Sequence, residues 1–384
     1  MRLANILFFG LGLFFSGCKK TDMQSGNTTD ECFTTQANGA IIEGQYIIAY
    51  NNFEDFNSPS TLRIAEVSKD VLKENGISSS ALRTSFTGDV RGFVAKLTSE
   101  EAARLKSSGM VKSVEPDRII ALSTCFTIVA PSLITWNVNK VGYGDGAGKT
   151  AWILDTGIDF DHPDLTVDAA RSKSFLSSTT SADDENGHGT HVAGIIGGKN
   201  NTIGVLGVAS GAMLVSLRVL DKEGKGTVSS TIQALSYVSA NAKAGDVVNM
   251  SFGEEDISDA LDRQVKAIAA KGIFVAIAAG NDSKPASLFS PARANATNIF
   301  TVSAVDSLNN FASFSNFGNE TVDFAAPGVS IVSTYIGGGY ARMSGTSQAT
   351  PHVAGLLLLE GNNLHYSSTA LNDPDGNADR IVMK

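Results

Sequence analysis

The sequence predicts an α/β protein with a mostly parallel central sheet flanked by helices, preceded by a smaller α+β domain. From about residue 131 onward, short apolar and β-branched runs alternate with segments of helical spacing that end in glycine. Apolar strands separated by helices are typical of a parallel sheet covered on both faces. Residues 45–123 instead combine several strand patterns with two helix patterns, which fits a small α+β sandwich.

Length and composition agree with two globular domains. The chain has 384 residues, of which 42% are hydrophobic and 18% charged, and domains typically take ~100–200 residues each. Its 38 glycines indicate many tight turns and close backbone approaches. The net charge of −9 offers no basic face, so nucleic acid is excluded as a partner.

The first 18 residues read as a secretory signal rather than as part of the fold. Their apolar stretch from Leu3 to Phe15 is shorter than the ~20 residues of a membrane span. The ending FFSGC resembles the bacterial lipoprotein signal, in which the cysteine, here Cys18, is lipidated after cleavage. An ordinary signal peptide with an incidental cysteine is the alternative. The polar residues 19–44 are predicted to form a tether.

Cleavage at Cys18 would leave two cysteines, Cys32 and Cys125. An even number of cysteines in an exported protein suggests one disulfide, and two free thiols are the alternative.

The elements predicted for the smaller domain are strands at 46–50, 92–97 and 111–117, and helices at 59–76 and from 98 to 109. Gly76 ends the first helix. Thr98 and Glu101 have the capping-box spacing that starts the second, and Gly109 is its expected stop. Pro116 is expected to break the last strand.

The strands predicted for the larger domain are 150–155, 213–221, 246–251, 272–281 and 298–306, with helices at 230–245 and 258–272. Three of these strands end in polar residues of catalytic type, namely Asp155, Ser251 and Asn281. In open α/β sheets, ligands bind outside the carboxyl ends of the strands. The sequence therefore predicts a functional site at one rim of the sheet.

Three motifs supply the parts of a nucleophilic site. LDTGID contains Asp155, NGHGTHVAG contains His188, and GTSQATPHVAG contains Ser347. A serine hydroxyl becomes a good nucleophile when an imidazole takes its proton, and a carboxylate fixes the tautomer of that imidazole. Taken alone, Ser347 also fits a helix cap. The chain order Asp, His, Ser is that of subtilisin.

On these motifs the sequence resembles the subtilisin-like serine proteases, the subtilase family, from about Trp136 to the C-terminus. The resemblance implies that Ser347 is the nucleophile, His188 the general base and acid, and Asp155 the orienting carboxylate. It also implies that Asn281 and the backbone N–H of Ser347 stabilise the oxyanion. No cofactor is implied for catalysis.

The resemblance further implies a groove in which an extended peptide pairs with two segments as an added strand. The groove residues implied are Ser251, Phe252, Gly253, Gly224, Lys225 and Gly226, with Ala278 and Gly280 lining the pocket for the residue before the scissile bond. These small residues suggest a large apolar or broad preference. Glu254 and Glu255 replace the usual glycine and proline. They either favour basic residues in the substrate or face solvent, and we prefer the solvent-facing interpretation. Gln348 replaces a usual methionine.

A calcium site is implied by the resemblance of GKNNTIGVLGVA and DHPDL to a subtilisin calcium loop. The ligands would be side-chain oxygens of Asp164 and Asn201 and backbone carbonyls of Lys199, Ile203 and Val205. Such mixed oxygen ligands suit calcium. A surface loop that needs no metal is the alternative.

The other histidines have weaker claims on chemistry. HGTH, with His191 three residues after His188, lacks the glutamate of the zinc pattern H-E-x-x-H. We expect His191 and His352 to be helix residues packed near the site. His162 and His365 have no partner that the sequence can name.

Residues from about 46 to 122 resemble the subtilisin inhibitor propeptide, which assists folding and leaves its tail in the groove as a product. Cleavage would fall between Leu122 and Pro131, and the count of residues favours Ser123–Thr124. A Cys32–Cys125 disulfide would then keep the cut propeptide attached. The domains expected are a signal at 1–18, a tether at 19–44, the propeptide at 45–123 and the catalytic domain at 124–384.

The expected function is that of a serine endopeptidase, self-processed from a precursor and exported, either to the bacterial cell envelope as a lipoprotein or by secretion. Its partners would be peptide or protein substrates and its own propeptide, with a membrane reached only through the lipid. One alternative is a catalytically silent homologue that binds peptides. A purely structural surface lipoprotein is the other.

Overall fold

The computed structural model describes residues 31–34, 38–51, 61–128 and 133–384. The predicted signal peptide, Cys18 and the first part of the predicted tether lie outside these residues. Within the described part of the chain, no helix is both long and apolar enough to cross a membrane.

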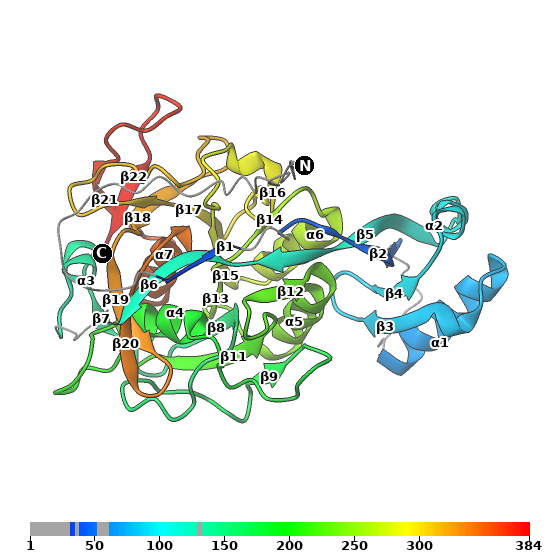
Figure 1. Cartoon of the computed structure of the whole chain (residues 1–384), viewed down its shortest axis with the longest axis horizontal. Coiled ribbons are helices and arrows are strands. Elements are labelled where there is room, and N and C mark those ends of the chain that lie inside the picture. Colours follow the sequence, from blue (N-terminus) through cyan, green and yellow to red (C-terminus); the bar gives the residue numbers. More distant parts are fainter. Residues whose placement is uncertain (1–30, 35–37, 52–60, 129–132) are drawn as a thin grey trace, which may run out of the picture.

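The larger domain is built on a nine-stranded sheet (Figure 1). Its strands, in spatial order, are β21 (His365–Thr369), β22 (Arg380–Met383), β18 (Phe324–Pro327), β17 (Ile299–Val305), β15 (Phe274–Ala278), β13 (Val247–Met250), β8 (Thr150–Asp155), β11 (Met213–Arg218) and β9 (Lys173–Ser174). All neighbouring strands are parallel except β21 and β22. The mostly parallel sheet is therefore confirmed.

Helices cover both faces of this sheet, because its central strands β8, β13 and β15 are apolar and buried on both sides. In β8, Trp152 and Leu154 join a core cluster with α5 (Val228–Asn241) and α6 (Asp259–Ala269). The alternate residues Ala151 and Ile153 join a second cluster with α4 (His188–Gly197) and α7 (Thr346–Glu360). This alternation is the period of two of a strand buried on both faces. A short helix, α3 (Trp136–Val141), precedes the sheet.

The smaller domain projects from one side of the larger one and contains an antiparallel sheet with two helices (Figure 1). Its elements are β2 (Ile41–Tyr50), α1 (Thr61–Glu74), the 3₁₀ turn η1 (Ser79–Ala81), β3 (Leu82–Phe86), β4 (Gly92–Lys96), α2 (Ser99–Lys106) and β5 (Val111–Ala121). The predicted capping box is confirmed: the Thr98 hydroxyl accepts from the Glu101 N–H, and the Glu101 carboxylate accepts from the Thr98 N–H.

The predicted break at Pro116 is wrong, since β5 continues to Ala121. At Pro116 the strand pairs with β2 alone, because its other neighbour, β12 (Lys225–Thr227), pairs only with residues 119–121. A proline is tolerated where a strand has one open edge.

Part of the predicted tether is also wrong, because β2 already begins at Ile41 and β1 (Glu31–Thr34) pairs with β6 (Ser123–Ile128). Parts of this polar segment pair with the open backbone edges of β5 and β6. Hydrophobic patterning does not reveal such backbone pairing. Strand β20 (Gly339–Ser344) pairs with β6, and β19 (Ile331–Tyr335) pairs with β20. Two short pairs are β7 (Gly144–Asp145) with β10 (Ala209–Ser210) and β14 (Glu254–Glu255) with β16 (Phe289–Ser290). The 3₁₀ turn η2 (Ala286–Leu288) completes the described elements.

Candidate active site

The polar strand ends meet at one rim of the nine-stranded sheet. The strands β8, β13 and β15 are neighbours and run parallel. Asp155 is the last residue of β8, Ser251 follows β13, and Asn281 lies three residues after β15. The helices α4 and α7, which begin at His188 and Thr346, pack against each other at this rim.

Asp155 and His188 form a buried pair. His188 Nδ1 lies 2.8 Å from Asp155 Oδ1, and the two side chains are 1% and 0% exposed. Since a carboxylate oxygen accepts, Nδ1 carries the shared proton and leaves Nε2 as an acceptor. His188 Nε2 has no hydrogen-bond partner among the described residues. The imidazole is thus held in the tautomer that can take a proton.

Ser347 is the second residue of α7, and its side chain does not cap the helix. Its hydroxyl donates to the Ser251 carbonyl at 2.7 Å, and the Ser251 hydroxyl donates to the Ser347 carbonyl at 2.8 Å. The capping interpretation is therefore wrong. His188 Nε2 and the Ser347 hydroxyl do not share a hydrogen bond here, so the hydroxyl must turn from Ser251 before His188 can take its proton.

Asn281 is tied to the start of α7. Its amide oxygen accepts from the Thr346 backbone N–H at 2.8 Å and from the Thr346 hydroxyl at 3.0 Å. The NH₂ end of the same amide is then the end that can act as a donor. The backbone N–H of Ser347 and the positive end of the helix dipole also lie at this helix start, which suits a developing negative charge.

Asp184, which the sequence analysis missed, builds the turn that carries His188. It is 8% exposed, and its Oδ1 accepts from the backbone N–H groups of Asn186 and Gly187 at 2.9 and 3.0 Å. Its Oδ2 accepts from the Thr190 hydroxyl at 2.6 Å. Burial raises the pKa of Asp184. The sequence signal that could have identified Asp184 is an acidic residue a few positions before a helix whose N-cap is a glycine.

The smaller domain fills one wall of the predicted groove. Strand β12 pairs antiparallel with β5, with Lys225 opposite Ala121 and Gly226 opposite Ile120. The Leu122 backbone N–H donates to the Gly224 carbonyl at 3.0 Å. The segment Gly224–Gly226 therefore receives an extended chain as an added strand.

The other edge of β5 differs from the prediction. There the Ile119 N–H donates to the Ala40 carbonyl and the Ala121 N–H to the Asn38 side chain, at 3.0 Å each. Residues 38–40 thus line this edge of β5, and the pairing of Ser251, Phe252 and Gly253 with a substrate stays a prediction. This arrangement is set by the tertiary structure, because the polar segment 38–40 carries no strand pattern.

The two small residues assigned to the pocket have packing reasons for their size. Ala278 is buried at the end of β15. Gly280 has φ +107°, and a Cβ there would lie 2.2 Å from Asn316 Nδ2. A side chain at this position would displace Asn316, so the glycine is required by the fold.

Two acidic residues of β5 cap helices of the larger domain. Glu115 Oε1 accepts from the Ser258 hydroxyl at 2.7 Å and from the Ala260 N–H at 3.3 Å, at the start of α6. Asp117 Oδ1 accepts from the Ser229 N–H at 3.2 Å, at the start of α5. Burial raises the pKa of both carboxyl groups. The VEPD motif thus fixes the smaller domain on two helix N-termini.

We expect the double substitution Glu115→Ala and Asp117→Ala to lower the stability of the uncut chain. Each lost cap removes ~1 kcal/mol, and each kcal/mol lowers Tm by ~2–4 °C in chains of about 150–250 residues. Thermal unfolding in a Ser347→Ala background measures the change without self-cleavage. The exposed Glu66→Ala is the matched control, and equal Tm values for both variants would contradict the capping role.

The expectation that Glu254 and Glu255 both face solvent is wrong for Glu254. Glu255 is half exposed and forms an ion pair with Lys284. Glu254 is 0% exposed, because β14 lies against β5 of the smaller domain. The alternation of a strand sends the two neighbouring side chains to opposite sides.

The predicted calcium loop is closed by hydrogen bonds of its own. Asp164 Oδ1 accepts from Asn201 Nδ2 at 2.8 Å, and Asp164 Oδ2 accepts from the Val205 N–H at 2.9 Å. Asn201 Oδ1 accepts from the Ile203 N–H at 2.8 Å. Burial raises the pKa of Asp164, and the Lys199 ammonium is one of the charges that lower it. Asn201 thus presents its NH₂ group to Asp164, so the residues fit calcium only after this side chain turns.

We expect calcium to raise Tm if it binds this loop once Asn201 has turned. A free calcium concentration of about 100 times Kd would add ~2.7 kcal/mol to the free energy of unfolding if the loop binds the ion. Thermal unfolding of the full chain with calcium or with a chelator measures this. Asp164→Asn should abolish any calcium-dependent shift, and a shift that survives this substitution would place the ion elsewhere.

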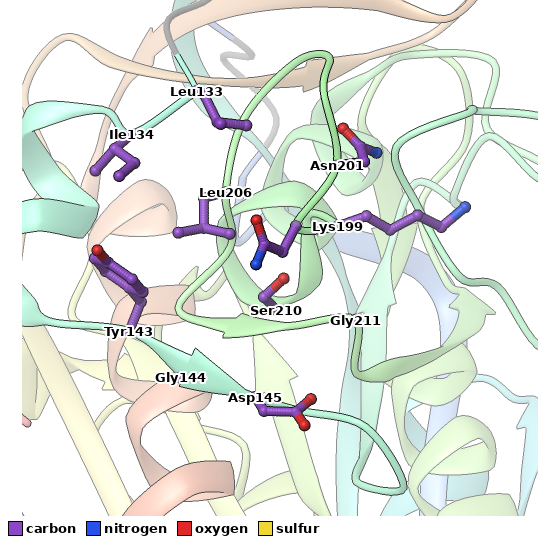
Figure 2. Close-up of a pocket in the computed structure, with 11 residues that line it drawn as sticks. Leu133, Ile134, Tyr143, Gly144, Asp145, Lys199, Asn201, Leu206, Ser210 and Gly211 are labelled. Atoms are coloured by element: carbon purple, nitrogen blue, oxygen red, sulfur yellow. The ribbon is translucent and has the colours of Figure 1, made fainter.

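A separate hollow of about 790 Å³ lies beside this loop (Figure 2). Its lining includes Leu133, Ile134, Tyr143, Lys199, Asn201 and Leu206. None of the residues with predicted catalytic or groove roles lines it, so it is not the substrate site.

Three other histidines, His162, His191 and His352, contact backbone carbonyl groups outside the catalytic pair. His191 Nε2 lies 3.1 Å from the Ile331 carbonyl, and burial lowers the pKa of His191 to about 3. His352 Nδ1 lies 2.9 Å from the Gln348 carbonyl, and burial lowers the pKa of His352 to about 4. Both are neutral buried helix residues, as expected. His162 Nε2 lies 3.0 Å from the Gly339 carbonyl.

The chain has recognisable relatives. Residues 146–370 match the family described as "Subtilase family", and residues 45–123 match "Peptidase inhibitor I9". The chain is 36% identical over 331 residues to alkaline serine exoprotease A of Vibrio alginolyticus, which covers 83% of this chain and 60% of that relative. The chain therefore spans less than two thirds of that relative's length.

A second relative is similar along most of its length. The chain is 34% identical over 377 residues to the extracellular serine proteinase of a Thermus species, covering 92% of this chain and 88% of that relative. Among solved structures, a cold-adapted subtilisin-like serine proteinase matches with a TM-score of 0.57 and 36% identity, over 66% of this chain and 98% of that chain.

Proposed function

Because the chain belongs to the subtilase family and carries a peptidase inhibitor I9 domain ahead of its catalytic domain, we propose that it is a serine endopeptidase made as a self-processing precursor. Ser347 attacks the substrate carbonyl while His188 takes its proton and then gives it to the leaving amine, which leaves an acyl-enzyme for water to hydrolyse. Asp155 holds the imidazole. The Asn281 amide and the Ser347 N–H stabilise the oxyanion.

The observation that carries this proposal is the buried Asp155–His188 contact of 2.8 Å beside the helix that begins next to Ser347. A catalytically silent homologue that binds peptides is the second candidate function. The unpartnered Nε2 of His188 favours the enzyme, because a buried acceptor without a partner is unfavourable unless it serves the reaction.

A serine-directed fluorophosphonate tests the proposal against the silent homologue. Protein expressed without residues 1–18 is allowed to process, then labelled and mapped by mass spectrometry, with casein hydrolysis followed in parallel. We expect the label on Ser347 and casein to be cut. An unlabelled Ser347 together with intact casein would overturn the proposal and leave peptide binding as the function.

Self-processing is proposed between Ser123 and Thr124, separating a propeptide at 45–123 from a catalytic domain at 124–384. The Leu122–Gly224 hydrogen bond supports this position, since it holds the chain along the groove wall one residue before Ser123. Export, with lipidation of Cys18, is proposed from the N-terminal sequence. The name of the extracellular Thermus relative agrees with export.

The propeptide is proposed to stay attached through a Cys32–Cys125 disulfide. In the β1–β6 register Cys32 lies opposite Cys125. Residues opposed in an antiparallel pair have Cα atoms ~4.5–5.5 Å apart, within the ~4.4–6.8 Å that a disulfide spans. After the proposed cut, Cys125 belongs to the enzyme and Cys32 to the propeptide side.

We expect processed protein to migrate as one species on a non-reducing gel and as two after reduction. Cys32→Ser should give two species under both conditions. Identical migration of the wild type with and without reductant would contradict the disulfide.

A further inference from the structure

Glu254 is a carboxyl group buried without a partner beside the groove. Neither of its oxygens has a hydrogen-bond partner among the described residues. Burial raises the pKa of Glu254 to about 9, while the Arg118 guanidinium is the leading charge that acts to lower it. An unpartnered buried carboxyl group is unfavourable, so this position calls for a reason beyond folding.

A second acidic residue on the same segment already holds a cation. The Asp256 carboxylate lies 2.6 Å from Arg118 Nη1, which also donates to the Gly39 carbonyl at 2.7 Å. Asp256 has φ 126°, a conformation rarely adopted by residues other than glycine. Strained backbone of this kind is concentrated at binding and catalytic sites.

The cation comes from the strand that occupies the groove. Arg118 belongs to β5, and two residues later Ile120 lies opposite Gly226 of the groove wall. Counted from the proposed cut, Arg118 is the sixth residue before the scissile bond. Since β5 marks the path of a bound chain, the side chain six residues before the bond reaches Asp256. Glu254 lies two residues before Asp256 on the same segment.

We propose that Glu254 and Asp256 form an acidic subsite that binds a basic side chain of the substrate at the place where Arg118 lies in the precursor. This inference rests on the proposed function, because it takes β5 as a guide to the substrate. When the propeptide leaves, Arg118 leaves with it, so Glu254 is no longer covered by β5 and Asp256 loses its cation. A substrate guanidinium would replace it with charge-assisted hydrogen bonds.

Quenched fluorescent peptides of sequence Asp-X-Ile-Ile-Ala-Leu-Ser-Thr-Ser-Phe, with X as Arg, Lys, Gln or Glu, test the subsite on processed protein from which the propeptide has been released by reduction. We expect kcat/KM for the wild type to be about tenfold higher with Arg than with Gln, and lowest with Glu. The double variant Glu254→Gln, Asp256→Asn should bring the Arg-to-Gln ratio to about one. Glu255→Gln, the exposed neighbour, should keep the wild-type ratio.

A four-residue chromogenic peptide, Ile-Ala-Leu-Ser, ends before the subsite and separates the two hypotheses. All variants should cut it at the same rate, which shows that the double variant is folded and active. A wild-type ratio near one, or an unchanged ratio in the double variant, would overturn the subsite alone. Failure of the wild type to cut the short peptide would overturn the proposed function and the subsite with it.

Discussion

Ser347→Ala is expected to leave the precursor uncut and to remove peptide hydrolysis. Without the hydroxyl no acyl-enzyme forms, and the loss in kcat, ~10⁶-fold, is carried over from subtilisin, where it was measured. The substitution also removes the hydrogen bond to the Ser251 carbonyl, worth only ~0.5–1.5 kcal/mol, so the variant should still fold.

Mass spectrometry of protein expressed without residues 1–18 measures this result. The wild type should give fragments that meet between Leu122 and Pro131, and Ser347→Ala should give one intact mass. Ser313→Ala changes an exposed serine and should be cut like the wild type. If Ser347→Ala is cut at the wild-type rate, the nucleophile lies elsewhere; if the wild type also stays whole, the silent homologue gains support.

Asp155→Asn is expected to lower kcat by ~10⁴-fold, the loss measured for the same change in a serine protease of another fold. An asparagine can donate its NH₂ to His188 Nδ1, which places the imidazole proton on Nε2. The imidazole then cannot accept the Ser347 proton. The same Asp155 oxygen, Oδ1, accepts from the Thr156 N–H at 2.7 Å, so turning the NH₂ toward His188 gives up that hydrogen bond. Its loss costs only ~0.5–1.5 kcal/mol, and the fold should persist.

Steady-state kinetics on the four-residue chromogenic peptide measure this loss. The matched control is Asp161→Asn, at an exposed aspartate six residues further along the chain, and it should retain wild-type kcat. If the precursor of Asp155→Asn is too slow to process itself, adding a trace of processed wild type releases it for assay. A loss of less than tenfold would contradict the orienting role of Asp155.

The sheet and its rim could be predicted because the pattern that specifies them is local. The run from Thr150 to Asp155 is apolar and β-branched until the carboxylate ends it, and the structure has a strand with those same bounds. Parallel neighbours then bring such strand ends together whatever their distance in sequence.

What escaped prediction depends on partners far away in the chain. Glu254 looks like a surface residue in sequence, and only the packing of β5 over β14 buries it. Asp184 stands in a polar run, and its role follows from the turn that its carboxylate closes. Gly39 and Ala40 join a strand edge through backbone groups, which every sequence possesses. Patterning of side chains therefore could not find them.

Strand β12 is the only part of the enzyme domain that enters the five-stranded sheet of the propeptide within the described residues. The sheet therefore has five strands while the two domains are docked, and it loses its edge strand β12 when they separate. β5 then exposes a row of unpaired N–H and C=O groups at residues 119–121, the kind of extended edge that other chains add to. A protease groove that binds extended peptides as an added strand pairs with the same kind of backbone groups. We therefore expect a propeptide that has separated, once any Cys32–Cys125 disulfide is reduced, to be cleaved by the enzyme that it inhibited. Inhibition could then not be restored.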